Sequence, residues 1–204
     1  MDIKAYKDER ENKRLANALI FFAKNTENCG AVKANKLLYY LDCHHLIKYG
    51  RKVLKDTYNK DAEGPVPHKA YHAVHALVDA QEYDNSENFM SEYIAIKVEK
   101  LKYEENEKEY ILHRLVPKKE FEGKWFSQSE REIMNEVAKK YFSTTATQLS
   151  RQTHLEAPWK SAVNNGDEID IKLFAIDKVT PEQYKEIESM ERDLQALENN
   201  CTCH

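Results

Sequence analysis

The chain has 204 residues, of which 41% are hydrophobic and 32% are charged, and these proportions suit one domain with a buried core, or a domain with an appendage. Its 31 basic and 35 acidic residues give a formal charge of −4, which supplies no cationic surplus for tight binding to nucleic acid. The sequence has neither an apolar run near the ~20 residues of a membrane span nor the apolar centre of a secretory signal. We therefore expect a cytoplasmic protein.

Two apolar helices are predicted near the start of the chain. Apolar residues recur at helical spacing over residues 12–25, and a second apolar stripe runs from Ala34 to His45. Gly50 is typical of the residue just past a helix end. We expect the two helices to pack as an antiparallel pair, and the stretch 35–71 to organise the rest of the chain. The apolar position of His45 favours a buried histidine bonded to backbone over a catalytic one.

A rigid corner is predicted after an extended candidate at residues 53–58. It consists of Gly64, Pro65, Val66 and Pro67. The two prolines fix their own φ angles and bias the residues before them away from the helical region. Pro67 also suits the first turn of a following helix, because its missing N–H would have no partner there.

The third predicted helix, residues 67–80, has a polar side that carries His68, His72, His75 and Asp79. That spacing could hold a transition metal. An HxxxH pair is a pattern of low specificity, however, so a solvated polar stripe is favoured. The terminal Cys201-Thr202-Cys203-His204 raises the same choice, and an unliganded chain end is favoured there. We therefore predict no metal and no cofactor.

The middle of the chain combines a hairpin with further helices. Runs rich in β-formers at residues 93–103 and 110–116 flank a charged segment and predict an antiparallel hairpin. Ser127 and Glu130 have the spacing of a helix capping box, and Thr145 and Gln148 repeat it. A short helix is predicted from Ala157. The expected fold class is α+β and predominantly helical: a compact multi-helix domain with a small antiparallel β-hairpin or sheet.

Two runs of this sequence resemble a known family. KLLYYLDCHHLIKYG followed by GPVP, and FSQSEREIMNEVAKKYFSTTATQLSRQTHLEAPWKSA, are similar to the two halves of the Panacea, or SocA-like, antitoxin domain of bacterial and phage toxin–antitoxin systems. The resemblance covers residues 12–163. Its second half rests on Ser127, Ser129, Glu130, Leu149, Ser150, Thr153, His154, Glu156, Pro158 and Trp159. Family members often carry aromatic residues just before the Gly-Pro corner, where this chain has Asp61, Ala62 and Glu63.

The resemblance implies an antitoxin that binds a cognate protein toxin directly and holds it inactive. Some relatives look like proteolytic adaptors that present the toxin to a cellular protease, and the sequence leaves both modes open. The candidate toxin-binding or family-motif residues are Gly64, Pro65, Val66, Pro67, His68, Tyr71, His154 and Trp159. For Trp159 and His154, a role in the core and its backbone bonding is favoured over a partner-binding patch.

Beyond the resemblance, residues 164–204 are predicted to form a strand plus helix extension, packed on the domain of residues 1–163. Ile169, Ile171 and Leu173 alternate with polar residues as in a strand, and Thr180-Pro181 is a typical helix start. The helix carries Tyr184, Ile187, Leu194 and Leu197 close to a heptad spacing. Packing within the chain is favoured over a seam with a partner, and this variable helix is a candidate for toxin specificity.

Other functional classes have less support. The sequence contains no Gly-rich phosphate loop, GxSxG or HExxH motif, so we predict that the protein is not an enzyme. The main alternative is a DNA-binding transcriptional regulator with a helix-turn-helix-like segment at residues 145–162, although only Arg151 and Lys160 are basic there. A homodimer stays open, and no membrane partner is expected.

Overall fold

A computed structural model of the chain describes residues 3–79, 88–102, 109–176 and 178–200. The fold class is confirmed, because helices dominate and the strands form two small antiparallel sheets. In chain order the elements are α1 (Ile3–Asn25), α2 (Ala31–Tyr49), β1 (Tyr58–Asn59), β2 (Val66–Pro67), α3 (His68–Asp79), η1 (Phe89–Glu92), β3 (Ile94–Lys102), β4 (Glu109–Pro117), η2 (Gly123–Trp125), α4 (Gln128–Lys140), α5 (Ala146–His154), α6 (Ala157–Ser161), η3 (Ile171–Ala175) and α7 (Pro181–Asn200).

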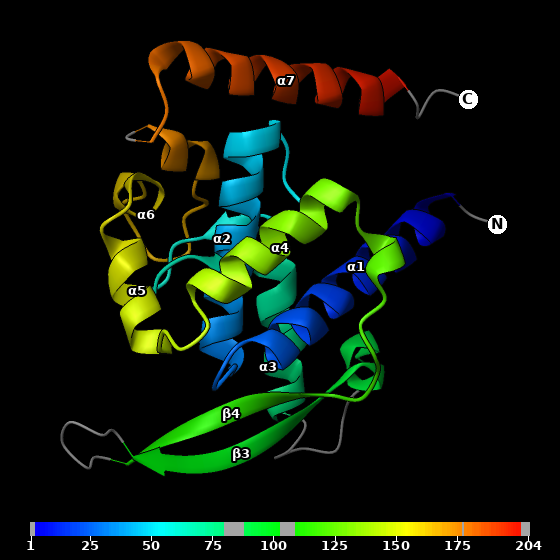
Figure 1. The fold of residues 1–204 in the computed structure, drawn as a ribbon, viewed down its shortest axis with the longest axis vertical. Helices are drawn as coiled ribbons and strands as arrows, with labels where there is room; N and C mark the ends of the chain where they lie inside the picture. Colours follow the sequence, from blue (N-terminus) through cyan, green and yellow to red (C-terminus); the bar gives the residue numbers. More distant parts are fainter. Residues whose placement is uncertain (1–2, 80–87, 103–108, 177, 201–204) are drawn as a thin grey trace.

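Helix α2 is the centre of the molecule. It is buried on all sides over most of its length and contacts α1, α3, α4, α5, η3 and α7 (Figure 1). Apolar residues lie on every side of it, as expected for a helix in the middle of a core, although buried polar residues such as Lys36 and Asp42 interrupt them. At its end Gly50 has φ +68° and donates its N–H to the Leu46 carbonyl, as predicted for the residue after a helix.

Helix α1 precedes α2 and runs in the opposite sense, crossing it obliquely in Figure 1. It starts at Ile3, so the predicted start near Asn12 is too late. The extra turns are polar, and such residues favour a helix through their propensity and through pairs such as Glu9 with Lys13, whose carboxylate and ammonium lie 2.6 Å apart. An apolar stripe alone does not mark such turns.

The segment between α2 and α3 is held by buried carboxylates. Of the predicted extended stretch, residues 53–58, only Tyr58 lies in a strand, which continues to Asn59 and pairs with Pro67 and Val66. The Asp56 carboxylate accepts the backbone N–H groups of Lys69 and Ala70 at 2.9 and 3.1 Å. It therefore satisfies the first turn of α3 from a distant loop, as a capping side chain does.

The hairpin and both capping boxes are confirmed. Strands β3 and β4 pair from Ile94 opposite Pro117 to Lys102 opposite Glu109, and the predicted charged loop lies largely outside the described residues. Ser127 and Glu130 cap α4 reciprocally, and Thr145 and Gln148 do the same for α5.

The predicted strand at residues 169–173 is wrong. Residues Ile171 to Ala175 form the 3₁₀ helix η3, which begins with the Asp170 side chain accepting the Lys172 N–H. Ile171 and Phe174 are buried, and η3 contacts α2. One helical turn can bury these residues together, whereas an isolated strand would need a partner for its backbone. Within the described ranges, no helix is long and apolar enough to cross a bilayer.

Candidate partner-binding site

The Gly-Pro corner packs against α2 and α5. Gly64 lies in the left-handed region at φ +101°, and its N–H donates to the Asp61 carbonyl at 2.9 Å. A Cβ built there would overlap the Thr153 hydroxyl and lie 3.0 Å from Cε of Lys36. Glycine is therefore required both by the backbone conformation and by the close approach. The two separate runs that resemble the family meet at this point.

Lys36 on α2 contacts the corner from the interior of the domain. Its side chain is fully buried, and its ammonium donates to the Pro65 carbonyl at 2.8 Å. Burial lowers the pKa of Lys36 to about 8, against the opposing effect of Asp61 and Glu63. Lys36 is not a predicted site residue, because the sequence does not show that this helix is buried on all sides, and a lysine in a helix usually faces solvent.

Trp159 covers the corner from the outside. Its indole N–H donates to the Asp61 carbonyl at 3.0 Å, and its ring stacks on His154 with centroids 4.2 Å apart. The Lys60 ammonium lies 4.1 Å from the centre of the same ring. Both aromatic side chains are half-buried. We call Lys60, Asp61, His154 and Trp159 the corner platform. Trp159 is thus neither fully buried in the helical core nor an exposed residue without contacts.

A second family residue, Glu156, points inward. It accepts a hydrogen bond from the Tyr39 hydroxyl at 3.0 Å. Burial raises the pKa of Glu156, although Tyr39, Lys178 and Tyr40 act in the opposite direction. Tyr40 stacks on Tyr141, with ring centroids 4.6 Å apart. The carboxyl and the tyrosines join α2, α4 and α6 behind the platform, which makes this cluster a positioning element.

His44 lies beside this cluster and makes stability sensitive to acid. Burial, together with Lys140, lowers its pKa to about 4, and its ring meets Phe174 edge-on at 5.4 Å. An unfolded chain binds this proton below pH 6.5 but the folded chain only near pH 4, so stability is lost as the pH falls through that window. We expect His44→Phe to remove about 1–3 kcal/mol of that loss. Urea unfolding at pH 7 and pH 4.5 measures it: equal losses in both proteins would contradict the prediction.

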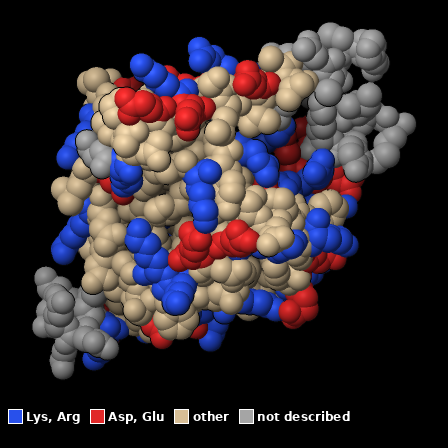
Figure 2. All heavy atoms as spheres, turned by 45° about the horizontal axis from the view of Figure 1, so that its top comes forward, with Lys and Arg blue, Asp and Glu red and all other residues tan. Residues whose placement is uncertain are grey.

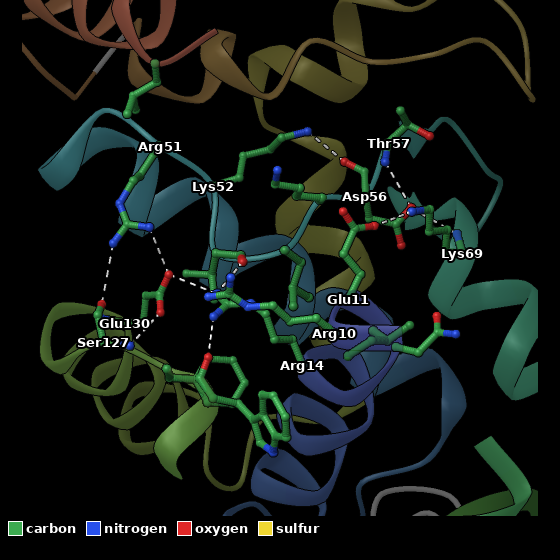
Figure 3. Close-up of a pocket in the computed structure, with 18 of the residues that line it drawn as sticks. Arg10, Glu11, Arg14, Arg51, Lys52, Asp56, Thr57, Lys69, Ser127 and Glu130 are labelled. Carbon is green, nitrogen blue, oxygen red and sulfur yellow. Dashed lines mark hydrogen bonds and ion pairs between the residues drawn. The ribbon is translucent and has the colours of Figure 1, made fainter. Parts of the chain in front are cut away.

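A groove of about 810 Å³ opens on another side of the molecule (Figure 3). It lies between α1, the segment after α2, the start of α4 and one edge of α7. Its charged lining residues are Arg10, Arg14, Arg51, Lys52, Lys55, Lys69 and Lys124, with Glu11, Asp56, Glu130 and Glu191. This groove was not predicted from the sequence. The two arginines of α1 four residues apart were a usable signal, but the other cations come from distant segments.

Comparison with protein families decides what this fold is related to. The model described as "Antitoxin SocA-like, Panacea domain" matches residues 35–160. The chain belongs to this family. No curated protein and no solved structure matches the chain. The Panacea match begins at Asn35 on α2 and ends at Lys160 on α6, so it includes the corner and the platform. The resemblance to this family, which was based on the two sequence runs, is therefore confirmed.

The structure brings together only some of the predicted Panacea motif residues. Gly64, Pro65 and Pro67 are buried, and Val66 is half-buried beside the platform. His68 and Tyr71 belong to α3, where they contact other rings: His68 meets His72 at 4.6 Å between centroids, and Tyr71 meets His75 at 4.0 Å. In the described part of the chain, no three His, Cys, Asp or Glu side chains are placed to hold a metal. The terminal Cys-x-Cys-His lies outside the described residues.

The proposed specificity helix α7 packs on the Panacea domain through one edge. Ile187 is buried, Tyr184 and Leu194 are half-buried, and Leu197 is exposed. Met190 lies against the Cα of Gly50, where a Cβ would meet it at 2.6 Å. His45 on α2 is buried, with Nδ1 2.7 Å from the Arg51 carbonyl, as expected of a structural histidine.

Proposed function

We propose that this Panacea domain neutralises a cognate protein toxin by binding it directly in the cytosol. The observation that carries the proposal is the family match over residues 35–160, which assigns the chain to an antitoxin-like family. Masking of a toxin needs affinity and shape but no covalent chemistry. Delivery of the bound toxin to a cellular protease would use the same first step, and both modes belong to the proposal.

The proposal assigns no reaction to the protein. Support comes from the buried titratable groups, whose partners are structural. The Asp42 carboxylate accepts two backbone N–H groups, and the Glu156 carboxylate accepts the Tyr39 hydroxyl. His45 is bonded to the Arg51 carbonyl. A general base needs to reach a substrate proton, and these groups face the interior.

The corner platform is the first candidate for the toxin contact. Tryptophan is enriched among residues that dominate binding energy, and Trp159 is half-buried, held in place by the Asp61 carbonyl and His154. A ring that is already ordered loses little entropy on binding. The platform also presents a cation, Lys60, over the same ring.

The test of the function is co-expression with the product of an adjacent gene that arrests growth when expressed alone. We expect growth to recover and the two proteins to co-purify. Recovery without association, or association without recovery, would contradict direct neutralisation. Dependence of recovery on a cellular protease would assign the adaptor mode.

Trp159→Ala should weaken toxin binding by about 30-fold or more, the effect of losing one dominant interface residue. The matched control is Phe142→Ala, because Phe142 is an aromatic residue that is 49% exposed outside the platform. Isothermal titration measures both variants, with thermal unfolding as a check on folding. Equal affinities of the two variants for the toxin would show that the platform is not part of the interface.

Regulation by DNA binding has less support. The segment at residues 145–162 contains α5 and the five-residue α6, which is short for a recognition helix. On the face shown in Figure 2, over the residues that are described, basic and acidic side chains are interspersed rather than gathered by sign. Tight DNA binding requires a clustered cationic surface. A mobility shift of the gene's own promoter at physiological salt would favour this alternative.

A further inference from the structure

The groove described above has an excess of basic residues, unlike the chain as a whole. Seven Lys or Arg residues and four Asp or Glu residues line it, although acidic residues outnumber basic ones in the whole chain. Its volume of about 810 Å³ is within the range of sites that bind ligands or peptide segments. A local surplus of cations in an acidic protein attracts an acidic partner.

The acidic residues of the groove already have hydrogen-bond or ion-pair partners within the chain. One oxygen of Glu130 accepts hydrogen bonds from both Arg14 and Arg51, at 2.9 and 3.0 Å. Asp56 accepts backbone N–H groups at the start of α3, and Glu11 pairs with Lys69 at 2.8 Å. Cations therefore balance the charges of Glu130 and Glu11, and backbone N–H groups hold the Asp56 carboxylate at the start of α3.

Three cations of the groove, Arg10, Arg51 and Lys52, can still contact a ligand. The Arg51 side chain is 41% exposed, and its second amino group reaches only the Ser127 hydroxyl at 3.5 Å. Lys52 donates to the Asp56 backbone carbonyl and not to its carboxylate. Among the described residues, no carboxylate lies within ion-pair distance of Arg10 or Lys52. Figure 3 shows Arg10, Arg51 and Lys52 around the same opening.

Much of the uncharged lining is apolar, which favours a protein segment over a nucleic acid. Leu15, Val53, Leu54 and Phe126 are buried at the base of the groove, and Trp125 is half-buried there. A phosphate backbone would need a continuous track of cations and would gain nothing from aliphatic walls. A segment that carries both carboxylates and apolar side chains fits both features of the lining.

The chain itself places such a segment at the groove's edge. Helix α7 contains six acidic and two basic residues, and its Glu191 and Leu194 are part of the lining. These two residues are three apart, on one face of the helix. Glu191 lies 3.3 Å from Lys172, which is outside the groove. A carboxylate and a leucine on one helix face are thus the kind of side chains that this groove accommodates.

We propose that the groove binds an acidic amphipathic helical segment of the partner protein, next to α7. The inference rests on the proposed function only for the identity of the partner as the toxin. The partner's carboxylates meet Arg10, Arg51 and Lys52, and its apolar side chains contact the base of the groove. Since the contact is charge-assisted, its affinity falls as salt is added.

The experiment is a selection of phage-displayed random peptides on the full-length protein. The groove variant is Arg10→Glu with Lys52→Glu. Its matched control is Lys100→Glu with Lys139→Glu, two exposed lysines outside the groove with the same total change of charge. We expect acidic peptides with apolar residues at helical spacing. Their affinity should fall by about tenfold or more in the groove variant and stay near wild type in the control.

Enrichment of no acidic peptide, or peptides that bind both variants equally, would overturn the proposal. Random-sequence duplex DNA is tested in parallel, and DNA binding lost only in the groove variant would assign the groove to nucleic acid instead. The purified toxin separates this inference from the proposed function. Peptide binding in the groove with no associated growth inhibitor would leave the inference standing and reject the function. If no acidic peptide is enriched and the toxin binds both variants equally, the inference about the groove is rejected and the proposed function stands.

Discussion

Gly64→Ala should destabilise the protein by about 3–5 kcal/mol, because it combines a strained backbone with an overlap. At φ +101° an alanine is unfavourable by itself, and its Cβ would overlap the Thr153 hydroxyl beside the buried Lys36. The neighbours cannot yield easily, since Lys36 is bonded to the Pro65 carbonyl. Chemical denaturation of the variant and the wild type measures the effect.

Gly166→Ala is the matched control. Gly166 also has a positive φ, +91°, but a Cβ there would meet nothing within 4 Å. It should show the backbone cost alone, about 1–3 kcal/mol. Adding Thr153→Ala to the Gly64 variant should recover part of its loss, by removing the overlapping hydroxyl. A Gly64 variant no less stable than the Gly166 variant would show that the corner is not packed as described.

Asp42→Ala should cost about 3–5 kcal/mol, because it leaves two buried N–H groups without an acceptor and leaves the Tyr58 hydroxyl with only the Leu38 carbonyl, at 3.2 Å. The carboxylate accepts the N–H groups of Val53 and Leu54 at 2.7 and 2.8 Å and the Tyr58 hydroxyl at 2.8 Å. It is fully buried, and burial raises its pKa to about 7. Denaturation and amide exchange at Val53 and Leu54 measure the loss.

Two variants control for this result. Asp42→Asn keeps an oxygen for the two N–H groups, so it should cost much less than the alanine. Tyr58→Phe removes only the hydroxyl, with its hydrogen bonds to Asp42 and to the Leu38 carbonyl, and should cost about 1–2 kcal/mol. Amides at positions 53 and 54 that exchange no faster in Asp42→Ala than in wild type would show that the carboxylate does not hold this loop.

The groove and the corner depend on the same segment between α2 and α3. Asp42 holds its start, and Asp56 joins it to the first turn of α3. Arg51 and Lys52 extend from it into the groove, while Gly64 and Pro65 at its other end lie under the platform. One loop therefore positions residues of both candidate partner surfaces. A change in Asp42 is expected to weaken both.

Much of the fold could be predicted from local patterns. The capping boxes at Ser127 and Thr145, the glycine after α2 and the β3–β4 hairpin each depend on residues near one another in the chain. The prediction of a strand at residues 169–173 was wrong, because the structure there depends on contacts with residues distant in sequence. Its alternation was real, but burial against α2 determines the local structure, and a 3₁₀ turn buries Ile171 and Phe174 together.

The class of fold and the family could both be recognised from the sequence alone. Helix periodicity, capping spacing and the order of the two motif runs are properties of residues near one another in the chain. They can therefore be recognised without a structure. The three-dimensional structure was needed to show that Gly64 lies against Thr153, that Trp159 covers Asp61, and that cations from four segments share one groove. Those contacts join residues distant in sequence, and burial sets their energies. No local pattern encodes which distant residue will be the neighbour.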